Sequence, residues 1–369
     1  MRIFLSAGEQ SGDLHGAAVA REILRLQPET ELLGLGGIRM ESAGVRILYP
    51  LPRHAIIGFV GVFRHLPEIW NVWSLVRRSW QTERPDVVVL IDYPGFHLRL
   101  IKLAHRMGIP VVYYIAPQMW AWAEYRVAVL RECVRKLLVI LPFEEGFFQK
   151  HKVDCVFVGH PLMDILQRIK PKAFHSGTVE NPTIGLLPGS RRGELKHILP
   201  TMLEAAQRIR DSYSGASFAL PLAETLNESD LQPFSLPPWV EVTRDPAYRR
   251  RTQMDFAWTT SGTATLENAI LGVPMAVLYR THWVNAILAR RLIRTHHIGL
   301  VNLVAGEKIC PEFLQERLQA ESLASWTLDF FTDENRRRIM HEELLRAREL
   351  LGSTGASERA AAEILNLQD

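Results

Sequence analysis

The chain has little cysteine. Its 369 residues include three cysteines, Cys133, Cys155 and Cys310, which are far apart and odd in number. Neither a disulfide framework nor a CxxC metal motif can be built from them. The sequence therefore predicts a protein of a reducing compartment.

Long apolar runs are also missing. The apolar run at the N-terminus spans only a few residues before Gly8, which is too short for a signal peptide. No uncharged run reaches the roughly 18 residues of a membrane-spanning helix. We therefore expect a cytoplasmic protein that contacts the inner membrane peripherally and does not cross it.

Charge of one sign is not in large excess either. The formal net charge is +3 and 22% of the residues are charged, which is too mild a balance to indicate nucleic acid as a partner. His, Asp and Glu do not cluster with the spacing of metal ligands, so no metal or other cofactor is expected. Hydrophobic residues make up 47% of the chain, enough for two domain cores.

Short apolar runs rich in Val, Ile and Leu recur along the chain, each followed by a turn and a helical pattern. Runs that are apolar throughout are typical of strands buried on both faces of a parallel sheet. Their alternation with helices of about 10–15 residues indicates βαβ units. The runs cover residues 2–6, 32–35, 87–91, 111–115, 136–141 and 156–158, and then 183–187, 218–221, 239–243, 254–259 and 274–278.

A polar stretch at 164–182 separates the two series of runs and is interpreted as a linker. The predicted fold class is α/β, with two Rossmann-like doubly wound parallel sheets that face each other across a cleft. We expect domains at 1–167 and 168–340, followed by helices at 341–369 that could cross back to the first domain.

Asp92 directly follows the apolar run at 87–91. In open parallel sheets, ligands bind beyond the carboxyl ends of the strands. A carboxylate at that position can act as a general base. The alternatives are a helix cap and an ion pair with a neighbouring arginine.

The loop after the first run contains Gly8, Ser11 and Gly12. Small residues let a backbone approach a ligand closely, and the following helix start offers free N–H groups. The spacing is not that of the dinucleotide motif GxGxxG. The alternative is a tight turn with Asp13 as the helix cap.

The loop after the fourth run contains Gln118, Trp120 and Trp122. Tryptophan rings beside an amide can stack on a sugar and hydrogen-bond its hydroxyls. The alternative is ordinary aromatic packing of the loop.

The second series of runs opens with a strand, followed by Gly189, Ser190 and Arg191 and then a helical pattern. Backbone N–H groups, a hydroxyl and a guanidinium can converge on a phosphate there. The loop lacks the Gly-Lys-Ser/Thr of a Walker A motif. The alternative is a turn with solvated arginines.

Ser261, Gly262 and Thr263 stand at another predicted helix start and form a second candidate phosphate site. Glu267 follows one helical turn after Thr263 and could accept hydrogen bonds from a ribose diol. The alternative is a capping box of Ser or Thr with Glu, and the two roles are compatible.

Residues 62–80 contain an apolar stripe with flanking arginines. Three tryptophans at helical spacing beside basic residues are typical of a helix that contacts a membrane surface or acyl chains. The alternative is an amphipathic helix that faces the core. Residues 287–294 form a second basic amphipathic candidate. The stripe contains Val62, Phe63, Leu66, Trp70 and Trp73, and Ile69, Val76 and Trp80 continue its spacing.

Taken together, the motifs make the chain resemble the lipid-A-disaccharide synthase family. They occur in the family's order and extend from residue 7 to about residue 302. The motifs are AGEQSGD (7–13), IDYPGF (91–96), APQMWAW (116–122), LPFE (141–144), VGHP (158–161), LPGSR (187–191), SGTATLE (261–267) and NL (302–303).

The resemblance implies an inverting glycosyltransferase of GT-B type in lipid A biosynthesis. Such an enzyme joins UDP-2,3-diacylglucosamine to 2,3-diacylglucosamine 1-phosphate (lipid X) through a β-1,6 linkage and releases UDP. The family's presumed catalytic Asp falls on Asp92 and its essential Arg on Arg191, while Glu267 and Asn302 fall in its nucleotide region. One departure is Gly95, where the family often has an acidic residue.

The resemblance places the acceptor and the base on the first domain and the UDP-sugar on the second. Two other classes of function stay open from the residues alone. One is another GT-B activity, such as a UDP-GlcNAc epimerase or a transferase with a soluble acceptor, which would not need the tryptophan stripe. The other is a non-catalytic binding module, which would tolerate loss of Asp92. A homodimer is also left open.

Overall fold

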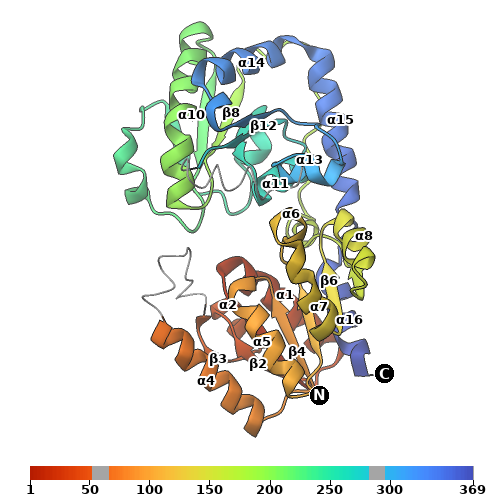
Figure 1. Ribbon diagram of the computed structural model, residues 1–369. Helices are drawn as coiled ribbons and strands as arrows, with labels where there is room; N and C mark the ends of the chain where they lie inside the picture. Colours follow the sequence, from red (N-terminus) through yellow and green to blue (C-terminus); the bar gives the residue numbers. More distant parts are fainter. Residues whose placement is uncertain (52–65, 282–295, 369) are drawn as a thin grey trace. The chain divides into compact units, whose positions relative to one another are not determined.

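The computed structural model describes residues 1–51, 66–281 and 296–368. The chain forms two units, of which the first combines Met1–Asp164 with Gly352–Asp369 and the second is Ile165–Leu351. The two ends of the chain therefore belong to the same unit (Figure 1).

The first unit is built on an all-parallel sheet of order β3-β2-β1-β4-β5-β6-β7 among the described residues. Its strands are β1 (Arg2–Ala7), β2 (Glu31–Leu35), β3 (Arg46–Tyr49), β4 (Val87–Ile91), β5 (Val111–Tyr114), β6 (Lys136–Val139) and β7 (Cys155–Phe157). Its helices are α1 (Gln10–Leu26), α2 (Ile38–Ser42), α4 (Leu66–Thr82), α5 (Pro94–Arg106), α6 (Met119–Trp122), α7 (Val127–Cys133), α8 (Pro142–Lys150), α9 (Leu162–Ile165, at the unit boundary) and α16 (Ala356–Leu365), with short 3-10 helices at Glu124–Arg126 and Asn366–Gln368.

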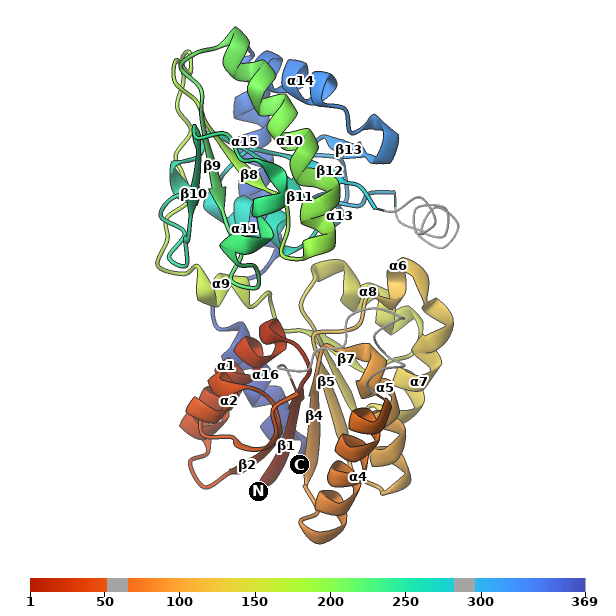
Figure 2. The same ribbon diagram turned by 90° about the vertical axis from the view of Figure 1, so that its left-hand side faces the viewer.

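The second unit repeats this plan with a parallel sheet of order β10-β9-β8-β11-β12-β13 among the described residues. Figure 2 shows α10 in front of this sheet and α15 behind it. The strands are β8 (Thr183–Leu187), β9 (Ser217–Pro221), β10 (Val240–Thr243), β11 (Phe256–Thr260), β12 (Met275–Tyr279) and β13 (Glu312–Leu314). The helices are α10 (Arg192–Ser212), α11 (Thr263–Leu271), α13 (Leu300–Ala305), α14 (Ala320–Thr332) and α15 (Glu334–Leu350), with 3-10 helices at Glu228–Asp230, Gln232–Phe234, Arg251–Gln253 and Gln315–Arg317.

The two parallel sheets confirm the predicted α/β class. The central strands are buried along nearly their whole length, as continuous apolar runs require. The sequence analysis missed the edge strands β3 and β13, because both are short and only partly buried and so lack a continuous apolar run.

The predicted division of the chain differs in detail from the units of the structure. The expected boundary at 167/168 lies close to the end of the first unit at Asp164. Residues 341–350 complete α15 in the second unit, where this helix packs against α11 and α13. Only the segment from Gly352 onward joins the first unit, where α16 packs beside α1 (Figure 1).

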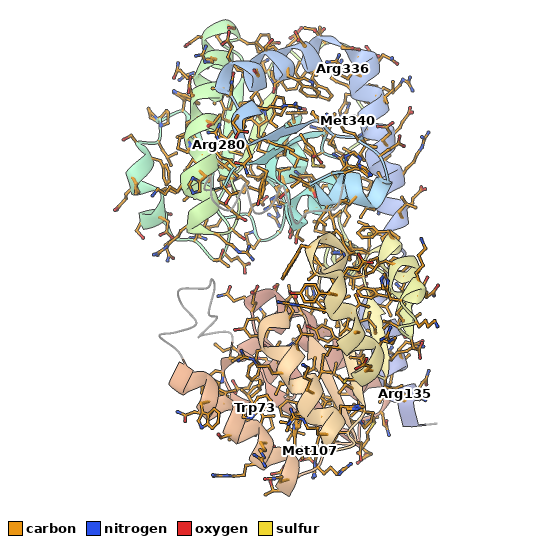
Figure 3. All side chains as sticks on the ribbon, viewed as in Figure 1. Trp73, Met107, Arg135, Arg280, Arg336 and Met340 are labelled. Atoms are coloured by element: carbon orange, nitrogen blue, oxygen red, sulfur yellow. The ribbon has the colours of Figure 1, made fainter. Side chains whose placement is uncertain are left out.

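Helix α4 carries the described part of the predicted apolar stripe. Val76 and Trp80 are buried in the core, and the Trp80 ring meets Phe4 of β1 edge to face at 5.3 Å between centroids. Trp73 is half-buried and packs against the same core (Figure 3). The core-facing interpretation is therefore correct for these residues, because the stripe covers the sheet. Trp70 points elsewhere and is 70% exposed.

The rest of the stripe carries less information. Val62 and Phe63 lie outside the described residues, as do 287–294, and the side chain of Leu66 is not described. Among the described helices, none has the length and apolar character needed to span a bilayer.

Asp164 ties the C-terminal helix to the first unit. Its carboxylate accepts the backbone N–H groups of Gly355, Ala356 and Ser357 at 2.5, 3.2 and 3.0 Å. These are the free N–H groups at the start of α16, and a carboxylate is their best partner. Asp164 is the last residue of the first segment of this unit. Its side chain thus holds the second segment, which enters the unit at Gly352.

We predict that Asp164→Ala loosens α16, because three N–H groups lose a charged acceptor. The free energy of unfolding should fall by about 1–3 kcal/mol. Hydrogen exchange of residues 356–365, followed by mass spectrometry, should become faster. Asp154→Ala is the control, since it removes only an exposed ion pair with Lys136. Unchanged exchange in Asp164→Ala would contradict the capping role.

Candidate functional site

The strand order of each sheet reverses direction once, between β1 and β4 in the first unit and between β8 and β11 in the second. Ligands of open α/β sheets bind beyond the carboxyl ends of the strands at such a reversal. Gly8 and Asp92 follow β1 and β4, while Gly189 and Ser261 follow β8 and β11. Of the predicted site residues, Gly8, Asp92, Gly189 and Ser261 therefore lie at the reversal points of the two units.

Asp92 and Tyr93 both have left-handed backbone conformations, with φ of 49° and 54°. Such angles are costly for residues with side chains, and they cluster at functional sites. The Asp92 carbonyl oxygen is held by two buried donors, the hydroxyl of Tyr113 and Nδ1 of His97, each at 2.6 Å. The turn that presents the Asp92 carboxylate is therefore held by side chains that bond to its backbone carbonyl.

These contacts define the tautomer of His97. Nδ1 must donate, because its partner is a carbonyl oxygen. Burial lowers the pKa of His97 to about 4, so the ring is neutral and Nε2 accepts. The Ser6 hydroxyl of β1 then donates to Nε2 at 2.8 Å. A chain of hydrogen bonds thus links β1, α5 and the end of β4.

The small residues after β1 serve the protein itself in part. A side chain at Gly8 would overlap the Tyr93 ring, with the nearest ring atom 2.1 Å from an added Cβ. Gly12 is buried against Ala7 and the Ile91 carbonyl, while Ser11 is exposed. Gly8 and Gly12 therefore let α1 and Tyr93 come close, and Ser11, in the first turn of α1, is the exposed small residue that can meet a ligand.

The predicted capping role of Asp13 is wrong. Helix α1 begins earlier, at Gln10 with Glu9 as its N-cap. The buried Asp13 carboxylate instead accepts the N–H groups of Gly37, Arg39 and Met40 at the start of α2.

The loop after β5 contains the predicted Gln118 and Trp120. Gln118 is exposed and is the N-cap of α6. Trp120 is half-buried, and its ring meets Phe143 edge to face at 4.9 Å between centroids. Its Nε1–H donates to Glu144 Oε1 at 3.0 Å.

Glu144 is a buried carboxylate that the sequence analysis did not single out. It is 1% exposed, and Oε2 accepts the N–H groups of Leu141 and Ile140 at 3.0 and 3.3 Å. Burial raises the pKa of Glu144 to about 7, the hydrogen bonds from Trp120 and the backbone oppose that rise, and the charge of Asp92 adds to it. The one signal in the sequence was its place in the LPFE motif.

The loop after β8 differs from the expected phosphate site. The backbone N–H groups of Ser190 and Arg191 donate to Glu194 Oε2 at 3.0 and 3.2 Å, as in a capping box. Gly189 has φ of 109°, and an added Cβ would overlap the same carboxylate. These two N–H groups are therefore occupied by the chain's own anion, which the sequence analysis did not foresee.

The two arginines beside this loop have different surroundings. Arg192 pairs with Asp230 at 2.8 Å. The exposed Arg191 side chain makes no hydrogen bond or ion pair with any other described residue. Arg191 is therefore the cation at this strand end that can reach an anionic ligand.

The start of α11 has free N–H groups. Gly262 and Thr263 are exposed, and the N–H groups of Thr263 and Ala264 bond to no other described residue. No side chain in the described part of the chain caps this helix. The half-exposed Ser261 contributes its carbonyl to the N–H of Leu300 at 3.0 Å. Of the two predicted phosphate sites, this one keeps its backbone donors available.

Glu267 already has partners. Tyr248 donates its hydroxyl to Oε1 at 2.9 Å, and Arg251 forms a short ion pair with Oε2. Arg251 also lies over the Tyr248 ring at 5.1 Å. Each carboxylate oxygen has a second lone pair, so a ribose hydroxyl can still bind.

Asn302 has a structural role in this conformation. It is fully buried, and its amide pairs with the backbone N–H and carbonyl of Cys310 and with Glu312, each at 2.9 Å. The predicted direct contact with a nucleotide would need these bonds to break. Asn302 instead fixes the segment that leads into β13.

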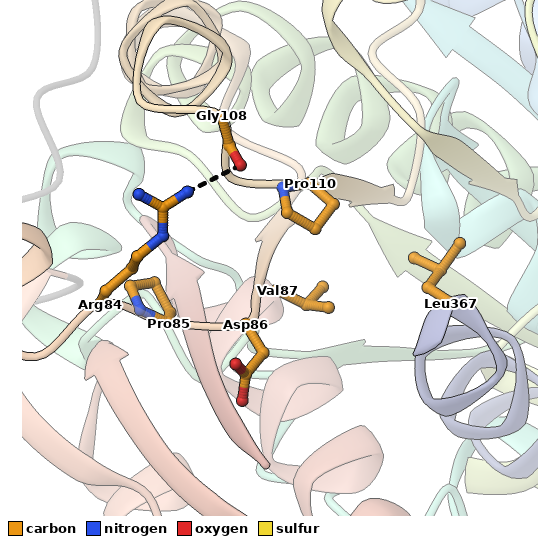
Figure 4. A pocket seen from close by; sticks show the side chains of 7 residues that line it. All are labelled: Arg84, Pro85, Asp86, Val87, Gly108, Pro110 and Leu367. Carbon is orange, nitrogen blue, oxygen red and sulfur yellow. Dashed lines mark hydrogen bonds between the residues drawn. The ribbon is translucent and has the colours of Figure 1, made fainter. Parts of the chain in front are cut away.

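A shallow hollow lies at the opposite edge of the first sheet. Arg84, Asp86, Val87, Gly108 and Pro110 line it with Pro85 and Leu367, and Arg84 donates to the Gly108 carbonyl at 3.0 Å (Figure 4). It faces the amino ends of β4 and β5, so it takes no part in the site. Among the described residues, no group of three or more His, Cys, Asp or Glu is arranged to hold a metal ion. The absence of a cofactor stays a prediction.

A family model described as lipid-A-disaccharide synthetase matches residues 3–365. Relatives named lipid-A-disaccharide synthase from Geobacter metallireducens and Nitrosococcus oceani are each 39% identical, with 99% and 98% of this chain and 97% and 95% of the relatives covered. The chain belongs to the lipid-A-disaccharide synthase family. The resemblance inferred from the motifs is thereby confirmed.

Solved structures place this family member among GT-B proteins, as predicted. Staphylococcus aureus MnaA with UDP matches with a TM-score of 0.67, at 14% identity over 99% of this chain and 97% of that one. A UDP-GlcNAc 2-epimerase from Neisseria meningitidis bound to UDP-GlcNAc has a TM-score of 0.64, at 13% identity over 99% and 100%. The calicheamicin glycosyltransferase CalG4 has a TM-score of 0.62, at 16% identity over 99% and 97%. Such identities show the fold alone, so the epimerases do not outweigh the synthase family.

The raised pKa of Glu144 in this family member predicts a pH-dependent stability. When a carboxyl has a higher pKa in the folded than in the unfolded protein, the folded protein loses stability as pH rises through these two pKa values. For Glu144 this range is from about pH 4.5 to about pH 7. Relative to Glu144→Gln, the wild type should therefore lose on the order of 2 kcal/mol of its free energy of unfolding between pH 5 and pH 8. Urea titrations at several pH values measure it.

Taking the difference in unfolding free energy between wild type and variant cancels the contribution of the histidines. The buried His97 and His160 have lowered pKa values, which act in the opposite direction and are the same in both proteins. A constant difference across this pH range would contradict the raised pKa of Glu144.

Proposed function

We propose that this protein transfers the 2,3-diacylglucosaminyl group from UDP-2,3-diacylglucosamine to lipid X, with inversion, in lipid A biosynthesis. The products are the β-1,6-linked disaccharide 1-phosphate and UDP. The observation that carries the proposal is the full-length match to the lipid-A-disaccharide synthase family. The polar residues at the two reversal points supply groups that suit this chemistry.

Asp92 is the proposed general base. Inversion in one displacement needs a carboxylate that takes the proton of the acceptor 6-hydroxyl as its oxygen attacks C1 of the donor sugar. The bond from C1 to the diphosphate oxygen breaks at the same time, and UDP leaves with the electron pair. The restrained turn at Asp92 supports this role, because a fixed base keeps the reacting oxygen aligned.

Arg191 and the start of α11 are the proposed diphosphate site. Charge develops on UDP as it leaves, and a guanidinium with oriented N–H donors stabilises that charge. Among the described residues, the Arg191 side chain and the N–H groups of Thr263 and Ala264 have no partner, which supports this assignment. Glu267 would accept the ribose hydroxyls. With a cation already in place, we propose that transfer needs no metal.

Both proposed substrates carry acyl chains, so we propose that the protein works at the cytoplasmic face of the inner membrane. The exposed Trp70 on α4 is a group that suits an interface between water and lipid. Trp73 contributes less, because it packs against the core.

Replacing Asp92 tests the proposed base. We expect Asp92→Asn to lower kcat by at least about 10³-fold, because the shape remains while the base is lost, and to leave UDP binding unchanged. A mass assay with UDP-2,3-diacylglucosamine and lipid X, without added metal, measures the transfer.

The control flanks the same strand, directly before β4. Asp86→Asn changes a carboxylate at the opposite end of β4, which accepts the N–H of Arg2. It should keep activity near that of the wild type. Near-normal transfer by Asp92→Asn would sink the mechanism.

Adjacent arginines give a matched pair for the diphosphate site. Arg191→Ala should lower kcat by about 10²-fold and weaken UDP binding measured by calorimetry. Arg192→Ala loses an ion pair between its own highly exposed guanidinium and the largely buried carboxylate of Asp230, and should stay within about threefold of the wild type. Equal effects of the two substitutions would refute the assignment of Arg191.

A further inference from the structure

Glu144 is a buried acid to which the proposed reaction assigns no role. It is a carboxylate that is 1% exposed, held at the start of α8. Burying such a group is costly unless each oxygen has partners. Oε2 accepts two backbone N–H groups and Oε1 accepts the indole of Trp120. The third contact is the one that a local cap does not require.

Trp120 is restrained on two sides. Its Nε1–H bonds to Glu144 at 3.0 Å, and its ring meets Phe143 at an interplanar angle of 89°. An indole has few free torsions, so a hydrogen bond to its only polar atom fixes the direction of its face. The remaining surface of Trp120 is partly exposed.

The surroundings of this contact are those of the proposed acceptor site. Trp120 follows β5 and Asp92 follows β4, and these strands are neighbours in register, with Ile91 opposite Tyr114. Glu144 follows β6 on the other side of β5. The charge of Asp92 is felt at Glu144. Base, indole and buried carboxylate thus lie at one edge of one sheet.

We propose that Glu144 is a positioning residue for the acceptor sugar, which it orients by holding the indole of Trp120 as a fixed stacking face beside Asp92. This inference rests on the proposed function. The indole face would meet the C–H face of the glucosamine ring and leave its 6-hydroxyl directed at Asp92. Glu144 would touch no substrate.

The chemistry of the contact explains why an acid is needed. Above its pKa of about 7, the Glu144 carboxylate accepts on both oxygens, so it can serve the backbone and the indole together. Glutamine has one oxygen and one NH₂ group. If its oxygen keeps the backbone N–H groups, its NH₂ faces the indole N–H and the bond to Trp120 is lost. Glu144→Gln therefore separates positioning from capping.

Kinetics of Glu144→Gln, Trp120→Phe and the double variant at about pH 8, above the raised pKa of Glu144, test the inference. Each single change should raise KM for lipid X about 5- to 20-fold, with kcat within about threefold and KM for the UDP-sugar unchanged. The double variant should be no worse than the poorer single one, because both changes break the same contact.

The control is Glu145→Gln. Glu145 is the next residue of α8, and its carboxylate accepts the N–H of Phe157 at 3.0 Å. This change should leave both KM values as in the wild type. Unchanged KM for lipid X in Glu144→Gln, or multiplied effects in the double variant, would overturn the positioning role.

A spectrum provides a readout independent of activity. With ¹⁵N-labelled tryptophan, the indole N–H resonance that disappears in Trp120→Phe should move upfield in Glu144→Gln, as a charge-assisted hydrogen bond is lost. An unmoved resonance would overturn the inference. A wild-type protein with this contact but no transfer would instead overturn the proposed function, and with it the acceptor assignment.

Discussion

Parallel pairing of the strands is the constraint on which the rest of the structure depends. After each strand the chain must cross back over a face of the sheet before the next strand begins. The carboxyl ends of all strands in a sheet therefore lie at the same edge. The register sets Ala7 opposite Ile91 and Thr259 opposite Leu187, which aligns the ends of the two strands at each reversal point. Loops that are 84 residues apart in the first unit (Gly8 and Asp92) and 72 residues apart in the second (Gly189 and Ser261) are therefore gathered without any direct preference for one another.

Strain at these ends is offset by interior contacts. Asp92, Tyr93 and Ile115 all have positive φ, and all follow central strands. Residues of this kind cost on the order of 1–3 kcal/mol each. The donors that hold the Asp92 carbonyl come from β5 and α5, so the core stabilises the geometry of the edge. The polar chain from Ser6 through His97 is buried, and its members satisfy one another.

The fold could be predicted from the sequence because apolar runs and turns are local signals. Asp92 could be found for the same reason, since it directly follows such a run. The partners of the other site residues could not. Nothing local to Gly8 or Gly189 distinguishes space for a ligand from space for Tyr93 or Glu194. The contacts of Glu267 come from a loop after β10, and those of Asn302 from the segment before β13. Contacts between residues that are far apart in the sequence leave no periodic pattern in it.

The return of the chain's end to the first unit has a consequence for synthesis on the ribosome. Helix α16 completes the surface over α1, yet it follows the whole second unit in sequence. While the second unit is being made, the first carries an uncovered α1 and an Asp164 carboxylate without its three N–H partners. The first unit to emerge is therefore completed only after the second unit has been made.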